Sequence, residues 1–173
     1  DDDFADHKTE LSRVAKNECQ RMAGMIKNLQ SFYKPSEGIE ADIKISNLTE
    51  DVLMIIGKDI KQKGIKIVRN FSESETTIKS VEDQIKQVVI NLLQNASDSI
   101  SRSDGEISLT IDSDNSNIIL KVQDNGKGIP KEDIGKLFEP FFTTKGIKGT
   151  GLGLSVSYGI VKKHGGEITV ESK

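Results

Sequence analysis

Three short segments rich in glycine or asparagine follow one another between residues 91 and 154 of this chain. Their sequences are Asn91-Leu-Leu-Gln-Asn95-Ala, Asp124-Asn-Gly-Lys-Gly128-Ile-Pro and Lys148-Gly-Thr-Gly-Leu-Gly-Leu154. Each segment alone is a weak signal, because the same residue types occur in ordinary turns and helix ends. Together and in this order, with strands and helices around them, they predict a nucleotide-binding site.

The apolar pattern around these segments alternates between strand and helix spacing. Strands are expected at Ile43 and Ile45 and over residues 65–68, 76–78, 106–112, 117–123 and 167–171. Helices are expected from a cap at Asn47 to Gly64, from a cap at Ser80 to about Ile100, and over residues 131–138 and 151–163. A strand hairpin with helices on one side predicts an α/β fold, namely a two-layer α/β sandwich with a mixed sheet.

One long helix is expected to precede this unit. Residues 8–34 carry apolar side chains at steps of three and four, and Pro35 ends the pattern. A single helix cannot bury such a stripe on itself, so it packs either on the body of the same chain or in a bundle with a partner chain. We favour the bundle. The predicted organisation is a helix over residues 1–34, a linker over 35–39 and a domain over 40–173.

Composition excludes several classes of function. Charged residues make up 29% of the chain and the formal net charge is −3, which argues against a nucleic-acid partner. The single cysteine, Cys19, excludes an internal disulfide and fits a reducing compartment. No stretch approaches the ~18 apolar residues of a membrane-spanning helix. We therefore expect a cytoplasmic domain, while attachment of a longer parent protein to the inner membrane stays open.

The two asparagines of the first segment are four residues apart on an expected helix, so their side chains share one face. A buried, unpaired carboxamide costs about 1–3 kcal/mol, so both side chains need partners. Carboxamide oxygens are hard ligands suited to Mg²⁺, which takes its other ligands from phosphates and water. Asn91 and Asn95 are therefore candidate metal ligands; the alternative is that both bond to loop backbone.

Asp124 ends an expected strand and opens the second segment. A carboxylate there can accept a hydrogen bond from the exocyclic amine of adenine, a contact that guanine cannot match. Gly126 and Gly128 allow backbone conformations closed to other residues and let the base approach closely. The alternative is a plain turn at the end of a strand, since Asp-Asn-Gly is a common turn sequence.

The third segment opens a helix, where free amides attract phosphate. It does not directly follow a strand, as a dinucleotide-binding fingerprint would, and it lacks the Lys-Ser/Thr ending of a Walker loop. Between the second and third segments, Phe138, Phe141 and Phe142 could anchor a mobile lid, and Thr143, Thr144 and Lys145 could reach phosphates. The alternative is a surface loop with a buried aromatic hinge.

The four segments, with Phe138–Phe142 included, resemble the boxes of the catalytic ATP-binding domain of bacterial sensor histidine kinases. That domain belongs to the ATPase superfamily of gyrase, heat-shock-90, histidine-kinase and mismatch-repair proteins, with a Bergerat-type α/β sandwich. The resemblance covers roughly residues 40–173. The leading helix resembles the second helix of the dimerisation and histidine-phosphotransfer domain, and the lid is most similar to the nitrogen-regulatory type of these kinases.

The resemblance implies ATP and Mg²⁺ as cofactors and gives each segment a role. Asn95 would ligate Mg²⁺ with Asn91 assisting, Asp124 would read adenine, and Asn91 and Lys145 would be the catalytic residues. The implied ATP-binding residues are Asn95, Asp124, Gly126, Gly128, Ile129, Thr143, Thr144, Lys145, Gly149, Thr150, Gly151, Leu152, Gly153 and Leu154. Related ATPases carry a water-activating Glu at the position of Asn91, and an amide cannot act as a general base.

The resemblance also implies partners: the receiver domain of a response regulator, a phosphoacceptor helix, and a second copy of the parent protein. The family's acceptor histidine stands before an acidic residue in a first helix, whereas His7 precedes Lys8, so autophosphorylation by this chain alone is doubtful. His164 is expected to support the end of its helix. Three other functions stay open: an ATPase clamp or a protein serine kinase of the same superfamily, and a non-catalytic interaction module.

Overall fold

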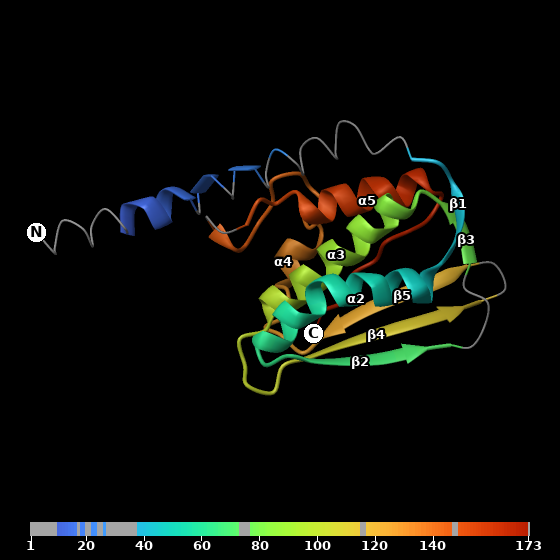
Figure 1. Ribbon diagram of the computed structural model, residues 1–173, viewed down its shortest axis with the longest axis horizontal. Helices are drawn as coiled ribbons and strands as arrows, with labels where there is room; N and C mark the ends of the chain where they lie inside the picture. Colours follow the sequence, from blue (N-terminus) through green and yellow to red (C-terminus); the bar gives the residue numbers. More distant parts are fainter. Residues whose placement is uncertain are drawn as a thin grey trace, which may run out of the picture.

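The computed structural model describes residues 10–16, 18–19, 22–23, 26, 38–72, 77–114, 117–146 and 149–172. The strands are β1 (Ala41–Lys44), β2 (Lys66–Phe71), β3 (Thr77–Ser80), β4 (Glu106–Ser113) and β5 (Ile118–Asp124). The helices are α2 (Ile45–Gln62), α3 (Glu82–Ser99), α4 (Lys131–Ile134) and α5 (Gly153–Lys163). The predicted α/β fold is confirmed, with α2, α3 and α5 on one side of the sheet (Figure 1).

The strands form two sheets among the described residues. The larger has the order β2-β4-β5, with β2 parallel to β4 and β4 antiparallel to β5, so it is mixed as predicted. The smaller pairs β1 with β3 in antiparallel fashion. The register of the larger sheet places Asp124 opposite Ile107, at the end of β5 that lies near the last turn of α3. The sheet thus brings the second glycine segment to one end of α3.

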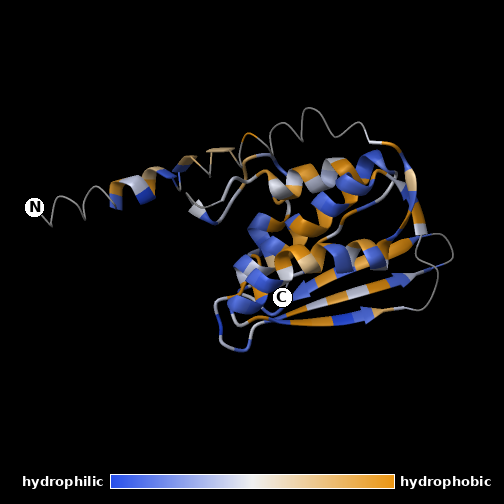
Figure 2. Ribbon diagram, in the orientation of Figure 1, coloured by the Kyte–Doolittle hydropathy of each residue, from blue (hydrophilic) through white to orange (hydrophobic). Residues whose placement is uncertain are grey.

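The core lies between the helices and the larger sheet. Most of its members come from α2, α3 and β4 and include Val52, Val89, Leu93, Ile107 and Leu109, all of them buried. Hydrophobic and hydrophilic residues alternate along the strands, so one face of the sheet meets the helices (Figure 2). This packing fixes the orientation of α3, which carries both asparagines of the first segment.

Two predicted helix caps are wrong. Asn47 is the third residue of α2, which starts directly after β1 at Ile45, and no side chain caps it. Ser80 is the last residue of β3, and the residue that precedes α3 is Val81. In both places a buried apolar residue, Ile45 or Val81, follows a strand, so burial decides the boundary more than capping does.

Two further predictions at the C-terminal side need correction. Residues 167–171 alternate between exposed and half-buried positions as a strand would, but they form no strand ladder with the described residues. The helix expected over 131–138 is only α4, and residues 135–138 continue as turns. A segment can keep strand-like alternation by packing its side chains without pairing its backbone.

The leading segment is described in part. Residues 10–16, 18–19, 22–23 and 26 are helical, and the remaining residues of the predicted 8–34 helix and of the 35–39 linker lie mostly outside the described residues. Several stripe residues are exposed, with Leu11 at 74% and Ile26 at 57%. The described part projects away from the domain (Figure 1), and Leu11, Val14, Met22 and Ile26 of this part are exposed.

Candidate nucleotide-binding site

Asn91 lies in the middle of α3 and joins this helix to α5. Its side chain is buried, its Oδ1 accepts a hydrogen bond from Gln87 at 3.0 Å, and its Nδ2 donates to the Gly153 carbonyl at 3.0 Å. The same Nδ2 lies 3.2 Å from Oγ of Ser157. The carboxamide therefore uses both of its ends inside the protein, and it fixes the first turn of α5 against α3.

Asn95 lies one turn further along the same face of α3, as the four-residue spacing predicts. Its Oδ1 accepts a hydrogen bond from Nζ of Lys145, in the lid, at 2.9 Å. The same ammonium group donates to Oδ2 of Asp98 at 3.0 Å, and Oδ1 of Asp98 accepts from Nζ of Lys63 at 3.1 Å. A lid cation, a carboxamide and a carboxylate thus meet at one point on α3.

Asp98 is the acidic member of this group. Partial burial would raise the pKa of its carboxyl, but hydrogen bonds from Lys145 and then Lys63, and their charges, outweigh burial and lower the pKa below its ordinary value. Asp98 is therefore ionised at neutral pH. Its side chain is 44% exposed and that of Lys145 is 31% exposed, so water reaches both.

The donor set at this point suits a hard cation. One ammonium group is already shared by a carboxamide oxygen and a carboxylate oxygen, which shows that two oxygens can converge on a single positive centre. Among the described residues there is no group of three or more His, Cys, Asp or Glu side chains that could hold a metal by themselves. The carboxamide oxygen of Asn95 is a hard ligand of the type that Mg²⁺ takes beside waters and phosphate oxygens.

Asp124 stands at the end of β5 with its carboxylate oriented by α3. Its Oδ1 accepts hydrogen bonds from Oγ of Ser99 at 2.6 Å and from the Gly126 amide at 2.9 Å. Ser99 is itself the last residue of α3, and its Oγ also lies 2.8 Å from the Ala96 carbonyl, so its single proton is shared between two acceptors. One oxygen of the carboxylate is thus fixed, which aims the other oxygen away from these donors.

The turn after Asp124 depends on its two glycines. A Cβ on Gly126 would clash with Oγ of Ser99 and come within 2.7 Å of the Ser99 carbonyl carbon, so a side chain there would push the turn away from α3. Gly128 has a φ of 71°, in the left-handed region that favours glycine. The next amide, of Ile129, donates to Oγ of Ser172 at 2.8 Å, which ties this turn to the C-terminal segment.

The lid, of which residues 141–146 and 149–152 are described, is closed at its base by backbone contacts. The Phe141 amide donates to the Gly151 carbonyl at 2.9 Å, so the two ends of the lid lie together. Gly151 has a φ of 66°, and a Cβ there would come within 2.6 Å of the Phe141 Cα. Phe141 has a φ of 70° and is 66% exposed, so it anchors the lid through its backbone; Phe138 packs on Tyr158 with 5.1 Å between ring centroids.

The remaining predicted residues lie along the lid and the start of α5. Oγ1 of Thr143 accepts from the Lys145 amide, and Oγ1 of Thr150 accepts from the Leu152 amide. Thr144 is exposed, and a Cβ on Gly149 would clash with Oγ1 of Thr143 and come within 3.0 Å of the Lys145 Cβ. Because α5 begins at Gly153, the amides of Gly153 and Leu154 lie in its first turn, where they have no acceptor within the helix.

Sequence reasoning missed Ser99, Asp98 and Lys63. Asp98 lies three residues after Asn95, so helical spacing alone could have placed it on the same side of α3. Ser99 and Lys63 gave no local signal, since their partners are 25 and 35 residues away in the chain. His164 behaves as predicted, because it follows α5 and its Nδ1 lies 2.8 Å from the Ile160 carbonyl.

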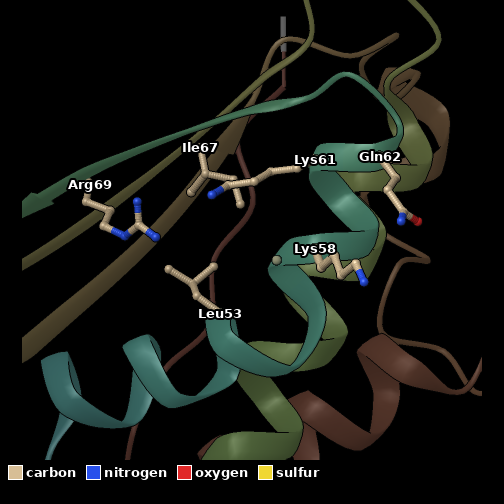
Figure 3. A pocket seen from close by; sticks show the side chains of 7 residues that line it. Leu53, Lys58, Lys61, Gln62, Ile67 and Arg69 are labelled. Carbon is tan, nitrogen blue, oxygen red and sulfur yellow. The ribbon is translucent and has the colours of Figure 1, made fainter.

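Two cavities lie away from Asn91, Asp124 and the glycine segment 149–153. One of about 400 Å³ lies between α2 and β2, where Leu53, Lys58, Lys61, Ile67 and Arg69 are among its lining residues (Figure 3). The other, of about 350 Å³, lies between α2 and α3 and is bordered by Lys63 and Asp98. Neither contains Asn91, Asp124 or the glycine segment 149–153, so we assign the candidate site from these contacts and not from cavity volume.

Comparison with known families agrees with this geometry. The family described as histidine kinase-, DNA gyrase B-, and HSP90-like ATPase matches residues 80–173, more than half of the chain. The sensor histidine kinase ZraS of Escherichia coli K12 is 31% identical over 164 residues, covering 95% of this chain and 35% of that protein. Sporulation kinase A of Bacillus subtilis is 32% identical over 160 residues, covering 92% of this chain and 26% of that protein.

Solved structures give the same result. The catalytic domain of histidine kinase ThkA superposes with a TM-score of 0.65 at 31% identity, over 72% of this chain and 82% of that one. ThkA in complex with the response regulator TrrA superposes with a TM-score of 0.73 at 26% identity, over 88% of this chain and 43% of that one.

The chain spans about a third of the length of the first curated relatives that it matches. No helix in the described ranges is both long and apolar enough to cross a membrane. The matched family, the named relatives and the Bergerat-type arrangement of α3, lid and α5 agree with one another. The chain belongs to the histidine kinase-, DNA gyrase B- and HSP90-like ATPase family and carries the ATP-binding catalytic domain of a sensor histidine kinase.

Proposed function

We propose that this chain binds ATP together with Mg²⁺ and delivers the γ-phosphoryl group to a histidine of the longer protein, for transfer to an aspartate of a response regulator. The observation that carries the proposal is the contact of Lys145 with Oδ1 of Asn95 at 2.9 Å. This contact brings a lid cation and a hard oxygen ligand to one point. The terminal phosphates need the cation, and their metal needs the oxygen ligand.

In the proposed complex, Asp124 accepts a hydrogen bond from the exocyclic amine of adenine. Its orientation by Ser99 and Gly126 supports this role, because one oxygen is fixed and the other stays available to the base. Gly126, Gly128 and Ile129 line the same turn. A carboxylate acceptor disfavours guanine, which presents an oxygen at the corresponding position.

The phosphates would lie between the lid and the start of α5. The amides of Gly153 and Leu154, in the first turn of α5, supply donors at the positive end of this helix. The glycine segment before them starts at Gly149 and includes Thr150, Gly151 and Leu152, and it supplies further donors. Thr143 and Thr144 add hydroxyl donors. Lys145 supplies a point charge once it leaves Asn95.

Asn95 would hold Mg²⁺, which neutralises charge on the β- and γ-phosphates when bound. Asn91 would assist in one of two ways. It can turn its Oδ1 from Gln87 toward the metal, or it can keep its bonds to Gly153 and Ser157 and so hold the phosphate-binding end of α5 in place.

The proposed transfer is an in-line displacement. A ring nitrogen of the acceptor histidine forms a bond to the γ-phosphorus, and the bond from that phosphorus to the β–γ bridging oxygen breaks, releasing ADP. The chain's residues contribute positioning and charge neutralisation. Asn91 cannot take a proton from water, so we expect slow hydrolysis and retention of the phosphoryl group for the acceptor.

The proposed partners follow from the same assignment. The related ThkA has been solved in complex with a response regulator, which supports a receiver domain as the partner here. The exposed stripe of the leading helix, including Leu11, Val14 and Met22, supports pairing with a phosphoacceptor helix and a second copy in a homodimer.

The adenine assignment is tested by comparing ATP and GTP binding to wild type and Asp124→Asn by calorimetry. Loss of a charge-assisted hydrogen bond worth roughly 1.5–3 kcal/mol predicts an ATP affinity about 10- to 100-fold weaker, with the preference over GTP reduced. Asp112→Asn, at the opposite end of the hairpin, is the control. An ATP affinity within twofold of wild type in Asp124→Asn would make the assignment wrong.

The transfer is tested with the longer protein and γ-labelled ATP. A phosphoryl group on histidine is labile in acid and stable in alkali, and we expect that behaviour. Acid-stable label on a serine would instead assign the chain to the protein serine kinases of this superfamily.

A further inference from the structure

We infer that Asp98 is a positioning residue for the lid: in the nucleotide-free protein it holds Lys145 on Asn95, and Mg·ATP must displace this lysine to reach Asn95. The inference rests on the proposed role of Asn95 as the metal ligand. Asp98 lies outside the residues predicted from the sequence, and displacement of Lys145 from Asn95 comes before metal binding.

The contacts form a chain from α2 to the lid. Nζ of Lys145 lies 2.9 Å from Oδ1 of Asn95 and 3.0 Å from Oδ2 of Asp98. The other carboxylate oxygen of Asp98 is held by Lys63 at 3.1 Å, and Lys63 also donates to Oγ of Ser97 at 3.1 Å. Asp98 belongs to α3 and Lys63 directly follows α2, and both helices pack in the core, so Asp98 sits on the rigid part of the domain.

Asp98 supplies the charge that retains the lid lysine. Asn95 is neutral, and Asp98 is the one carboxylate among the described residues that forms an ion pair with Lys145. Both side chains are partly exposed, so the pair is screened by solvent and of moderate strength. A contact of that strength can hold the lid in the absence of nucleotide and still release it on binding.

Lys145 and the metal compete for one oxygen. An ammonium group 2.9 Å from Oδ1 of Asn95 excludes a Mg²⁺ ion, which needs its ligand oxygen at about 2.1 Å. Binding therefore requires Lys145 to leave. The displaced ammonium becomes available to the phosphates, while Asp98 keeps its contact with Lys63. The fraction of molecules with Lys145 in place lowers the apparent affinity for Mg·ATP.

The lid contact is tested by amide hydrogen exchange of the nucleotide-free protein, comparing wild type with Asp98→Asn. The variant keeps the shape of the side chain and removes its charge. We expect exchange in residues 141–146 and 149–152 to be about two- to fivefold faster in Asp98→Asn, because the variant loses the charge that pairs with Lys145. Glu106→Gln is the matched control, since Glu106 pairs with Lys66 at 3.1 Å outside the lid.

Salt separates a charge contact from a general loss of packing. In wild type, raising the ionic strength should speed lid exchange, because it screens the Lys145–Asp98 pair, whereas lid exchange in Asp98→Asn should not respond. Equal lid exchange in the two proteins, or equal salt dependence, would overturn the inference.

A second measurement follows nucleotide binding. Freeing the lid predicts that Asp98→Asn binds Mg·ATP more tightly than wild type, by about two- to fivefold. Weaker binding would overturn the inference and make Asp98 a direct support of the metal. If wild type binds no Mg·ATP, the proposed function fails, and the exchange experiment still decides separately whether Asp98 holds the lid.

Discussion

Asn91 has a structural role that can be measured without any ligand. Its carboxamide makes hydrogen bonds to Gln87, Gly153 and Ser157 from a nearly buried position. At roughly 1 kcal/mol each, and with Gly153 still accepting from Ser157, Asn91→Ala should lower the free energy of unfolding by about 2–3 kcal/mol. For a chain of this length that is a shift in Tm of roughly 4–12 °C.

The assay is urea unfolding followed by far-UV circular dichroism, because the chain has no Trp. Asn95→Ala is the matched comparison: it removes one contact, to a lid lysine that is 31% exposed, and should cost less than about 1 kcal/mol. A loss below about 0.5 kcal/mol in Asn91→Ala, or equal losses in the two variants, would refute the conclusion that Asn91 holds α5 against α3.

Three other substitutions test separate parts of the account. Gly151→Ala should weaken ATP binding at least about tenfold by calorimetry, because a positive φ and the nearby Phe141 backbone leave no room for a Cβ; unchanged affinity would contradict the lid geometry. Leu109→Ala should lower the free energy of unfolding in urea by about 2–5 kcal/mol, since Leu109 is fully buried. A loss under about 1 kcal/mol would contradict its place in the core. The carboxyl of Asp98 has a lowered pKa, so its stabilising contribution is present above the ordinary pKa of 3.8 and is lost as the pH falls through the lower pKa of the folded state. The difference in free energy of unfolding between wild type and Asp98→Asn should therefore disappear in acid, and a difference that does not change with pH would contradict this.

The sequence predicted the order and type of most elements because their apolar spacing matches what the core requires. The side chains of Val52, Val89 and Leu93 are buried on the helix faces that the helical period predicts. The helix starts were wrong because Asn47 and Ser80 looked like caps, whereas burial of Ile45 and Val81 sets the boundaries. Local capping signals carry no information about which neighbouring residue reaches the core.

The candidate site was predictable only where one helix or one turn holds its members. Asn91 and Asn95 share a face of α3, as their spacing requires. Their partners were not predictable: Gly153 and Ser157 lie on α5, and Lys145 lies in the lid. Such contacts depend on how α5 and the lid pack on α3, which no local pattern encodes. The assigned roles in ATP and metal binding remain predictions.

The most direct test of the central claim is a calorimetric titration of ATP with and without Mg²⁺, on wild type and on Asn95→Ala. The account predicts saturable binding that tightens with Mg²⁺ in wild type and a much smaller effect of the metal in Asn95→Ala. Equal metal dependence in both proteins would contradict Asn95 as the ligand, and absence of ATP binding by a folded wild type would contradict the nucleotide site itself.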